Sequence, residues 1–181
     1  MHRLLVLRHA KTERTNPGGD HARVLVARGR DDAVIMGQFL ARENLAPDHA
    51  LASDAARTRE TFGLIVQGLG AKPAAEFNSA LYLAAPAAIL DAIRAAPGTA
   101  QTLLIIGHNP GLHQLAFELG QHGPRRLTEA LVAKFPTCAL AVIESDALSW
   151  QTIHPASCRL ARYMTAKSLR ENTLAEAEDD C

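Results

Sequence analysis

The chain has 181 residues, 48% of them hydrophobic and only 4% aromatic, so we expect a single domain whose core is built from aliphatic side chains. Nineteen Lys and Arg balance nineteen Asp and Glu without forming a basic stripe, which argues against a nucleic-acid partner. The longest apolar runs are strand-sized and the first residues form no signal-like apolar region, so we expect a cytoplasmic protein without membrane attachment.

Short apolar runs alternate with amphipathic segments in the first third of the chain. Residues 4–7 form a continuous apolar run bounded by charge, which is typical of a buried central strand. A polar, glycine-containing loop follows over residues 11–27, and the spacing of apolar residues then predicts a helix over residues 29–44. A short strand is expected at residues 50–52, after a boundary at Pro47.

A second helix is expected directly after this short strand. Either Ser53 or Asp54 can cap its first turn, because both side chains accept hydrogen bonds from backbone amides. Its apolar residues recur at i, i+3, i+4 and i+7, at Phe62, Ile65, Val66 and Leu69. Gly68 and Gly70 are expected to end the helix.

The middle of the chain predicts a third helix, a buried strand and a fourth helix. The third helix covers residues 86–95, and the apolar residues 102–106 form the strand. Asn109 is expected to be the N-cap of the fourth helix, with Pro110 at its first helical position. The buried stripe of that helix consists of Leu112, Leu115, Ala116 and Leu119.

The next segment predicts a short helix and a pair of strands. The helix lies near residues 128–133, and two β-like runs follow at residues 139–144 and 149–153. Ser145 and Asp146 are expected in the hairpin turn that joins these two strands.

These elements together predict one α/β domain over residues 1–164 with a mostly parallel central sheet. The polar stretch over residues 165–181 is acidic near its end and is expected to be a solvated tail. The three cysteines are odd in number and match no metal or redox spacing, so no disulfide framework is expected. Cys138 lies in an apolar run and is expected to be a small core residue.

Three cationic segments each lie where a predicted strand ends. Arg8 and His9 follow the first strand. Arg57 lies in the helix after the second strand, and His108 follows the strand at residues 102–106. In open α/β sheets the carboxyl ends of the strands form the binding crevice, so we expect these four side chains to converge there. No nearby carboxylate is clearly placed to neutralise them.

This grouping suits a phosphoryl group. Guanidinium side chains form paired, charge-assisted hydrogen bonds to phosphate oxygens, and the first turn of the helix around Arg57 would add positive potential. A neutral histidine placed in line is a competent nucleophile near pH 7, while a second histidine, if protonated, would stabilise the moving charge. Because two arginines would repel a metal ion, we expect no metal. Displacement by a histidine requires no organic cofactor either.

The order and spacing of several motifs point to a known family. They are LLVLRHAKTE at the start, Asp20-His21 with Leu25, Arg28 and Gly29, then LASDAARTRET, Leu81-Tyr82 and LLIIGHNPGL. Across residues 1–153 the sequence resembles the histidine phosphatase superfamily, also called the phosphoglycerate mutase-like or RHG family, and within it the SixA-type phosphohistidine phosphatases. The resemblance implies a single-domain, three-layer α/β/α fold of the phosphoglycerate mutase type.

The resemblance also implies roles for the four convergent residues. His9 matches the nucleophile that becomes phosphorylated, and Arg8 and Arg57 match the two phosphate-binding arginines. His108 matches the second histidine of the pocket. Ala10 replaces the glycine of the family motif, a position that contributes backbone rather than side chain. All four convergent residues are therefore candidate catalytic residues, and Arg8, Arg57 and His108 are also candidate substrate-binding residues.

Further candidate site residues lie in the first loop. Thr15 and His21 are candidate substrate-binding residues. Many relatives place a glutamate after the third strand as general acid, but residues 79–86 read SALYLAAP and contain no carboxylate. Glu13 or Asp20 remains a possible general acid. An imidazole leaving group needs less protonation than an alcohol does, so the missing acid favours phosphohistidine as the substrate.

The resemblance implies a phosphatase of signal transduction that acts on a phosphorylated histidine-containing phosphotransfer protein and releases inorganic phosphate. The interval between Arg57 and His108 has room for only one helix, one strand and another helix, which leaves an open site suited to a protein substrate. Two alternatives stay open. One is a small-molecule phosphomonoesterase or mutase of the same superfamily, and the other is a non-catalytic module that binds a phosphoprotein.

Overall fold

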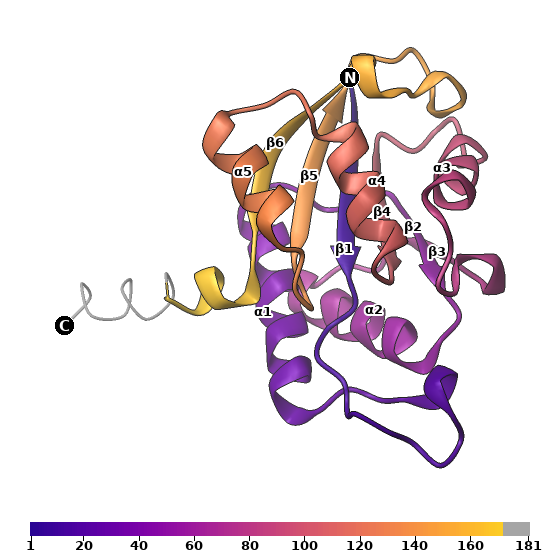
Figure 1. Ribbon diagram of the computed structural model, residues 1–181, viewed down its shortest axis with the longest axis vertical. Helices are drawn as coiled ribbons and strands as arrows, with labels where there is room; N and C mark the ends of the chain where they lie inside the picture. Colours follow the sequence, from indigo (N-terminus) through magenta and orange to yellow (C-terminus); the bar gives the residue numbers. More distant parts are fainter. Residues whose placement is uncertain (172–181) are drawn as a thin grey trace.

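In a computed structural model, which describes residues 1–171, a six-stranded sheet is covered by helices on both faces (Figure 1). The order of its strands is β3-β2-β4-β1-β5-β6. The pairs β1–β4, β2–β4 and β2–β3 are parallel, whereas β5 is antiparallel to both of its neighbours. The prediction of an α/β fold with a mostly parallel sheet is confirmed. The strands are β1 (His2–Arg8), β2 (His49–Ser53), β3 (Ala74–Asn78), β4 (Thr102–Gly107), β5 (Leu140–Ser145) and β6 (Cys158–Met164).

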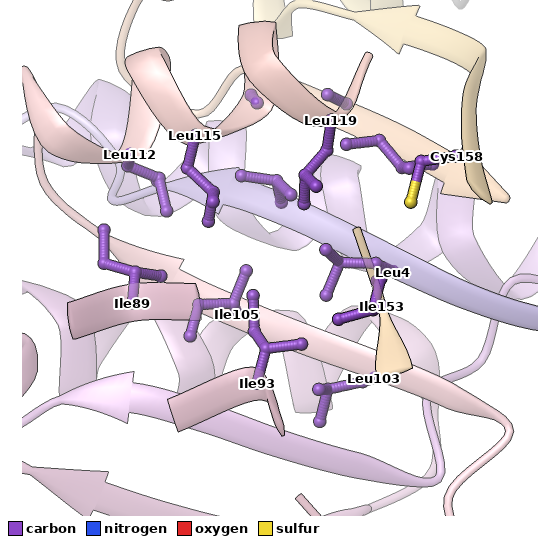
Figure 2. Close-up of a cluster of buried hydrophobic side chains, with 14 of the residues drawn as sticks. Leu4, Ile89, Ile93, Leu103, Ile105, Leu112, Leu115, Leu119, Ile153 and Cys158 are labelled. Atoms are coloured by element: carbon purple, nitrogen blue, oxygen red, sulfur yellow. The ribbon is translucent and has the colours of Figure 1, made fainter. Parts of the chain in front are cut away.

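The alternation of side chains along β1 separates two hydrophobic layers. Leu5 and Leu7 belong to a buried cluster that also contains residues of α1 and α2, whereas Leu4 and Val6 belong to a cluster with residues of α3, α4 and α5 (Figure 2). Because this central strand is covered on both faces, its middle residues 4–7 are all apolar. The helices are α1 (Ala27–Arg42), α2 (Ala56–Leu69), α3 (Pro86–Arg94), α4 (Gly111–Leu119) and α5 (Arg125–Ala133).

The prediction of a strand at residues 149–153 is wrong. Residues Trp150–Thr152 form a short 3-10 helix, in which Trp150 is fully buried and donates a 2.8 Å hydrogen bond from Nε1 to the carbonyl oxygen of Ala100. The strand that pairs with β5 is instead β6, and Ser145 is the last residue of β5 rather than part of a hairpin turn. The apolar side chains of this segment, Trp150 and Ile153, are thus both buried without forming a strand.

Several predicted helix ends differ from the observed ones. The residue that caps α2 is Ala55 rather than Ser53 or Asp54, and Pro110 rather than Asn109 caps α4, which begins at Gly111. The helix predicted near residues 128–133 is α5, which begins three residues earlier, at Arg125.

Gly68 lies within α2 rather than ending it. A Cβ atom there would lie 2.1 Å from the carbonyl oxygen of Val34, so this glycine permits the close crossing of α1 and α2. Gly70 caps the helix with a φ of 70°, in the left-handed region where glycine is favoured.

The described domain continues beyond residue 164. Residues 166–171 are helical, and Ala166 and Leu169 are buried in the cluster on the α1 side of the sheet. Arg170 also forms an ion pair with Asp32 of α1. The predicted tail therefore begins with packed residues, and its remainder, residues 172–181, lies outside the described part of the chain. Within residues 1–171 no helix is long and apolar enough to cross a bilayer.

The prediction that Cys138 is a core residue is confirmed, since its side chain is fully buried. Its backbone amide donates hydrogen bonds to the carbonyl oxygens of Arg8 and His9, both at 3.1 Å. The segment before β5 therefore packs against the end of β1, where the cationic side chains lie.

Candidate active site

The adjacent parallel strands β1 and β4 bring the two predicted histidines together. In the sheet, Arg8 at the end of β1 pairs with Gly107 at the end of β4, so His9 and His108 each follow in register. The backbone amide of His9 donates a 3.2 Å hydrogen bond to the carbonyl oxygen of Gly107. The centroids of the two imidazole rings lie 5.3 Å apart.

A pocket of about 420 Å³ lies at this edge of the sheet, and all four residues predicted to converge line it: Arg8, His9, Arg57 and His108. Lys11 and Arg23 also line the pocket, so that, with Arg8 and Arg57, it has four Lys or Arg side chains. Asp20 is the one carboxylate in the lining among the described residues. The pocket therefore combines an excess of positive charge with two imidazoles, as an anionic ligand requires.

His9 is held in one orientation by its neighbours. Its Nδ1 lies 2.8 Å from the carbonyl oxygen of Ala10, which can only accept a hydrogen bond, so Nδ1 carries the proton and Nε2 carries the lone pair. The backbone amide of Ala10 donates to Thr61 Oγ1 at 3.0 Å, and that hydroxyl donates to the carbonyl oxygen of Arg57 at 2.6 Å. The loop after β1 is thereby tied to α2.

Burial lowers the pKa of His9 to about 4, and this effect outweighs the opposing hydrogen bond to Ala10. The positive charges of Arg57 and Arg8 contribute to this lowering. His9 is therefore neutral at physiological pH and has the unprotonated nitrogen that a nucleophile needs.

His108 is also neutral in the free protein. Its Nε2 lies 2.9 Å from the hydroxyl oxygen of Ser53, at the end of β2. Burial, followed by the charges of Arg57 and His9, lowers its pKa to about 3. His108 is therefore unprotonated before an anion binds, unlike the protonated second histidine considered from the sequence.

The two predicted arginines are anchored in different ways. Arg8 donates from Nη1 to the carbonyl oxygen of Phe135 at 3.0 Å, and the side chain of Asn109 donates to the same oxygen at 2.9 Å. Arg57 lies in the first turn of α2, is 2% exposed, and donates from Nη1 to the carbonyl oxygen of Asp20 at 2.6 Å. Both guanidinium groups are thus oriented by backbone carbonyls.

Asp20 does not have the environment of a general acid. Its carboxylate accepts hydrogen bonds from the hydroxyl of Tyr82 at 2.6 Å, from Arg23 at 2.9 Å and from Arg57 at 3.0 Å. These bonds hold the pKa of Asp20 far below its usual value, so the group is ionised and has no proton to donate. The structure argues against the role of proton donor considered for Asp20.

Glu13 is also a poor proton donor, and it does not line the pocket. One of its carboxylate oxygens accepts from the side chain of Asn16 at 2.7 Å and from the backbone amide of Val24 at 3.1 Å. These two hydrogen bonds lower the pKa of Glu13, so the group is ionised. The same two bonds hold the loop before α1 in its shape.

The other two residues predicted in this loop lie outside the pocket. Thr15 is exposed and does not line it. His21 is exposed, and its Nε2 lies 2.8 Å from Asp54 Oδ1. The ring of His21 also contacts the edge of Tyr82, with 4.9 Å between centroids, so it belongs to the surroundings of Asp20 rather than to the pocket lining.

Several residues of the site were not predicted from the sequence. Tyr82 stands with its ring 5.4 Å from that of His108, and its presence in the motif Leu81-Tyr82 was the available signal. Tyr82 does not itself line the pocket, whose unpredicted lining residues are Lys11, Thr12, Arg23, Leu83, Asn109 and Thr137. Thr137 precedes β5 in a loop that carries no recognisable motif.

Within residues 1–171, no three His, Cys, Asp or Glu side chains are grouped so that they could hold a metal ion.

Comparisons with known proteins agree with this geometry. The sequence model of the histidine phosphatase superfamily (branch 1) matches residues 4–78, which include Arg8, His9 and Arg57. Uncharacterized protein MT1313 of Mycobacterium tuberculosis is 32% identical over 159 residues, covering 87% of this chain and 98% of that protein. A solved candidate phosphohistidine phosphatase SixA from Agrobacterium tumefaciens is 29% identical, with a TM-score of 0.74 and coverage of 91% and 97%. Another candidate SixA, from Nakamurella multipartitia, is 26% identical, with a TM-score of 0.79 and coverage of 90% and 95%.

Proposed function

Because this chain belongs to the histidine phosphatase superfamily and is an enzyme of that kind, we propose that it hydrolyses phosphohistidine on a protein substrate. A single observation carries the proposal. Two arginines and two histidines line one pocket, and among the described residues the one carboxylate in that lining is bound to Arg57. The pocket is thus equipped to bind a phosphoryl group and to attack it, but poorly equipped to protonate an alcohol leaving group.

The first step is a displacement at phosphorus by His9. Its Nε2 lone pair forms the new P–N bond, while the bond between phosphorus and the substrate imidazole breaks and the leaving nitrogen takes up a proton from solvent water. Arg8 and Arg57 bind the equatorial oxygens, where charge is spread in the transition state. His108 contributes an imidazole at the same oxygens, and the bound phosphoryl dianion would raise its pKa and so favour its protonation.

The second step regenerates the enzyme. A water molecule attacks the phosphorus of phospho-His9, the P–Nε2 bond breaks, and His9 returns to its neutral form, protonated at Nδ1 only. Inorganic phosphate leaves with the oxygen of the water, whose protons stay on the phosphate or pass to solvent. The hydrogen bond from Nδ1–H to Ala10 persists through both steps, because only Nε2 changes its bonding. That contact keeps the nucleophile in line without requiring the ring to reorient between the steps.

The state of the carboxylates supports a phosphoramidate over a phosphate ester. General acid catalysis contributes about 10²–10⁴-fold when an alkoxide must be expelled. Here Asp20 is ionised and Glu13 lies outside the pocket. An imidazole leaves at neutral pH with little assistance. The lack of a proton donor therefore lowers the rate less for phosphohistidine than for a sugar phosphate.

The similarity to SixA proteins supports a protein as the partner. The candidate SixA proteins to which the chain is similar are described as phosphohistidine phosphatases. A phosphorylated histidine-containing phosphotransfer protein of a signalling pathway is the partner that we propose, with the cytoplasm as the place of reaction.

The proposal is tested with substrates of three kinds: a phosphohistidine protein, p-nitrophenyl phosphate and a panel of sugar phosphates. We expect kcat/KM to be highest for the phosphohistidine protein. In His9→Ala, phosphate release from both the protein and p-nitrophenyl phosphate should fall by about three orders of magnitude or more, because the covalent route is removed.

Two results would contradict the proposed activity, and a third would contradict the proposed mechanism. Higher kcat/KM for sugar phosphates than for the phosphohistidine protein would identify a small-molecule phosphatase or mutase. Tight binding of the phosphoprotein without phosphate release would identify a binding module. Near-normal turnover by His9→Ala, with the purified variant shown to be folded, would remove His9 from the mechanism.

A further inference from the structure

A second hollow adjoins the active-site pocket. This basic groove has a volume of about 280 Å³ and is lined by residues from four parts of the chain. Lys11 and Thr137 line both hollows, so the groove and the pocket share a wall. A ligand with its phosphoryl group in the pocket would therefore extend toward the groove. Its basic lining residues are Lys11, Arg28, Lys134, Lys167 and Arg170.

The charges of the basic groove are not balanced by its acids. Asp32, the one acid of the lining within residues 1–171, is buried and paired with Arg170. Lys167 lies 3.6 Å from Glu171 in an exposed pair. Arg28 and Lys134 are exposed and form no ion pair with any residue of the described range. Because the chain has no net charge, the groove is a local positive region rather than part of a basic protein.

The arrangement suits an extended acidic surface rather than a small anion. Small-molecule sites bury most of their ligand and hold it with a few converging polar groups. Here the unpaired cations are exposed, and Arg28 and Lys134 come from the start of α1 and from the residue after α5. Exposed charges spread over a surface act through their summed field, which steers and orients a partner of opposite charge.

We propose that the basic groove docks acidic side chains that flank the phosphohistidine of the protein substrate. This inference rests on the proposed function and adds a specificity determinant to it. The groove would raise kcat/KM for substrates with acidic neighbours, because charge complementarity increases the rate of productive encounter. It would leave the chemical step unchanged, since neither Arg28 nor Lys134 lines the active-site pocket.

The test uses two synthetic peptides, each with one central phosphohistidine, flanked by glutamates in one peptide and by glutamines in the other. For the wild-type protein at low salt we expect kcat/KM to be about tenfold higher for the glutamate peptide. The preference should shrink as sodium chloride is added, because exposed charges are screened. In the double variant Arg28→Glu/Lys134→Glu the preference should disappear, with kcat for p-nitrophenyl phosphate unchanged.

Lys72→Glu provides the matched control. Lys72 is exposed and lies just before the start of β3, at the opposite edge of the sheet from the pocket, so this variant should keep the preference. If charge reversal impairs turnover of p-nitrophenyl phosphate, Arg28→Gln/Lys134→Gln removes the charges without adding new ones and should likewise abolish the preference.

Failure of the docking inference is distinguishable from failure of the proposed function. Equal kcat/KM for both peptides in the wild type, or a preference that survives both double variants, would overturn the docking inference while leaving a phosphohistidine phosphatase. Turnover of p-nitrophenyl phosphate without turnover of either peptide would overturn the proposed function instead.

Discussion

Asp20 Oδ2 lies 3.0 Å from Nη2 of Arg57, and the main-chain carbonyl oxygen of Asp20 lies 2.6 Å from Nη1 of the same guanidinium. In the free protein, an acidic residue of the first loop thus engages the arginine that we propose to bind phosphate. A phosphoryl group that used both Nη atoms would have to replace these contacts or share them.

Asp20→Asn is therefore expected to strengthen the binding of inorganic phosphate. The substitution keeps the shape of the side chain but removes a negative charge that competes for Arg57 and repels the ligand. We expect the inhibition constant of phosphate, measured against p-nitrophenyl phosphate, to fall by about threefold to tenfold.

Asp54→Asn is the control for this prediction. Asp54 pairs with His21 and does not line the pocket, so its substitution should change the inhibition constant little. Weaker phosphate binding by Asp20→Asn would mean that Asp20 orients Arg57 for the ligand. A large loss of kcat on phosphate esters would restore Asp20 as a proton donor.

A second prediction concerns the ionisation of the two pocket histidines. The pKa of His9 is lowered to about 4 and that of His108 to about 3, from an ordinary value of 6.5. In the free protein, the imidazole NMR signals of both residues should therefore stay in the neutral form when the pH is lowered from 8 to about 5. A titration of either ring near pH 6.5 would contradict this prediction.

The same shifts affect stability. Below pH 6.5 the unfolded chain takes up protons on His9 and His108 that the folded protein excludes, so the free energy of unfolding should fall as the pH drops toward 4. In urea titrations this decline should be smaller for the double variant His9→Gln/His108→Gln than for the wild type. An equal decline in the two proteins would show that other groups cause it.

A third prediction uses two glycines of α2. Gly68→Ala places a Cβ 2.1 Å from the carbonyl oxygen of Val34, so α1 and α2 must move apart, and the variant should lose about 1–3 kcal/mol of stability. Gly63 lies on the exposed side of the same helix, away from its ends, and a new Cβ there would have nothing within 4 Å. Gly63→Ala should therefore gain about 0.5–1 kcal/mol of stability. Equal effects of the two substitutions on the urea midpoint would refute the role assigned to Gly68.

The convergence of the site was predictable because it follows from topology. Residues after parallel, adjacent strands meet at one edge of a sheet, and the motifs around His9 and His108 mark two such strand ends. The continuous apolar run at residues 4–7 also predicted the strand whose two faces carry the two cores. These features depend on local sequence and on the general geometry of α/β folds.

Other features depended on contacts that local sequence does not encode. The environment of Asp20 arises because the first loop folds back onto Arg57 and Tyr82, which lie 37 and 62 residues away. The run around Trp150 looks β-like, but one buried indole anchors it as a short 3-10 helix. The edge strand β6 contains two arginines that interrupt its apolar pattern, and it went unpredicted for that reason.

In the proposed mechanism, phosphorus becomes covalently bonded to His9 in every turnover. The measurement is to mix the enzyme with p-nitrophenyl phosphate, quench it under acid-free conditions that preserve phosphohistidine, and locate the added group by tandem mass spectrometry. We expect phosphorylation at His9 in the wild type and none in His9→Ala. Phosphorylation at His108 instead, or rapid turnover with no phosphorylated residue in the trapped enzyme, would contradict the covalent mechanism proposed for this pocket.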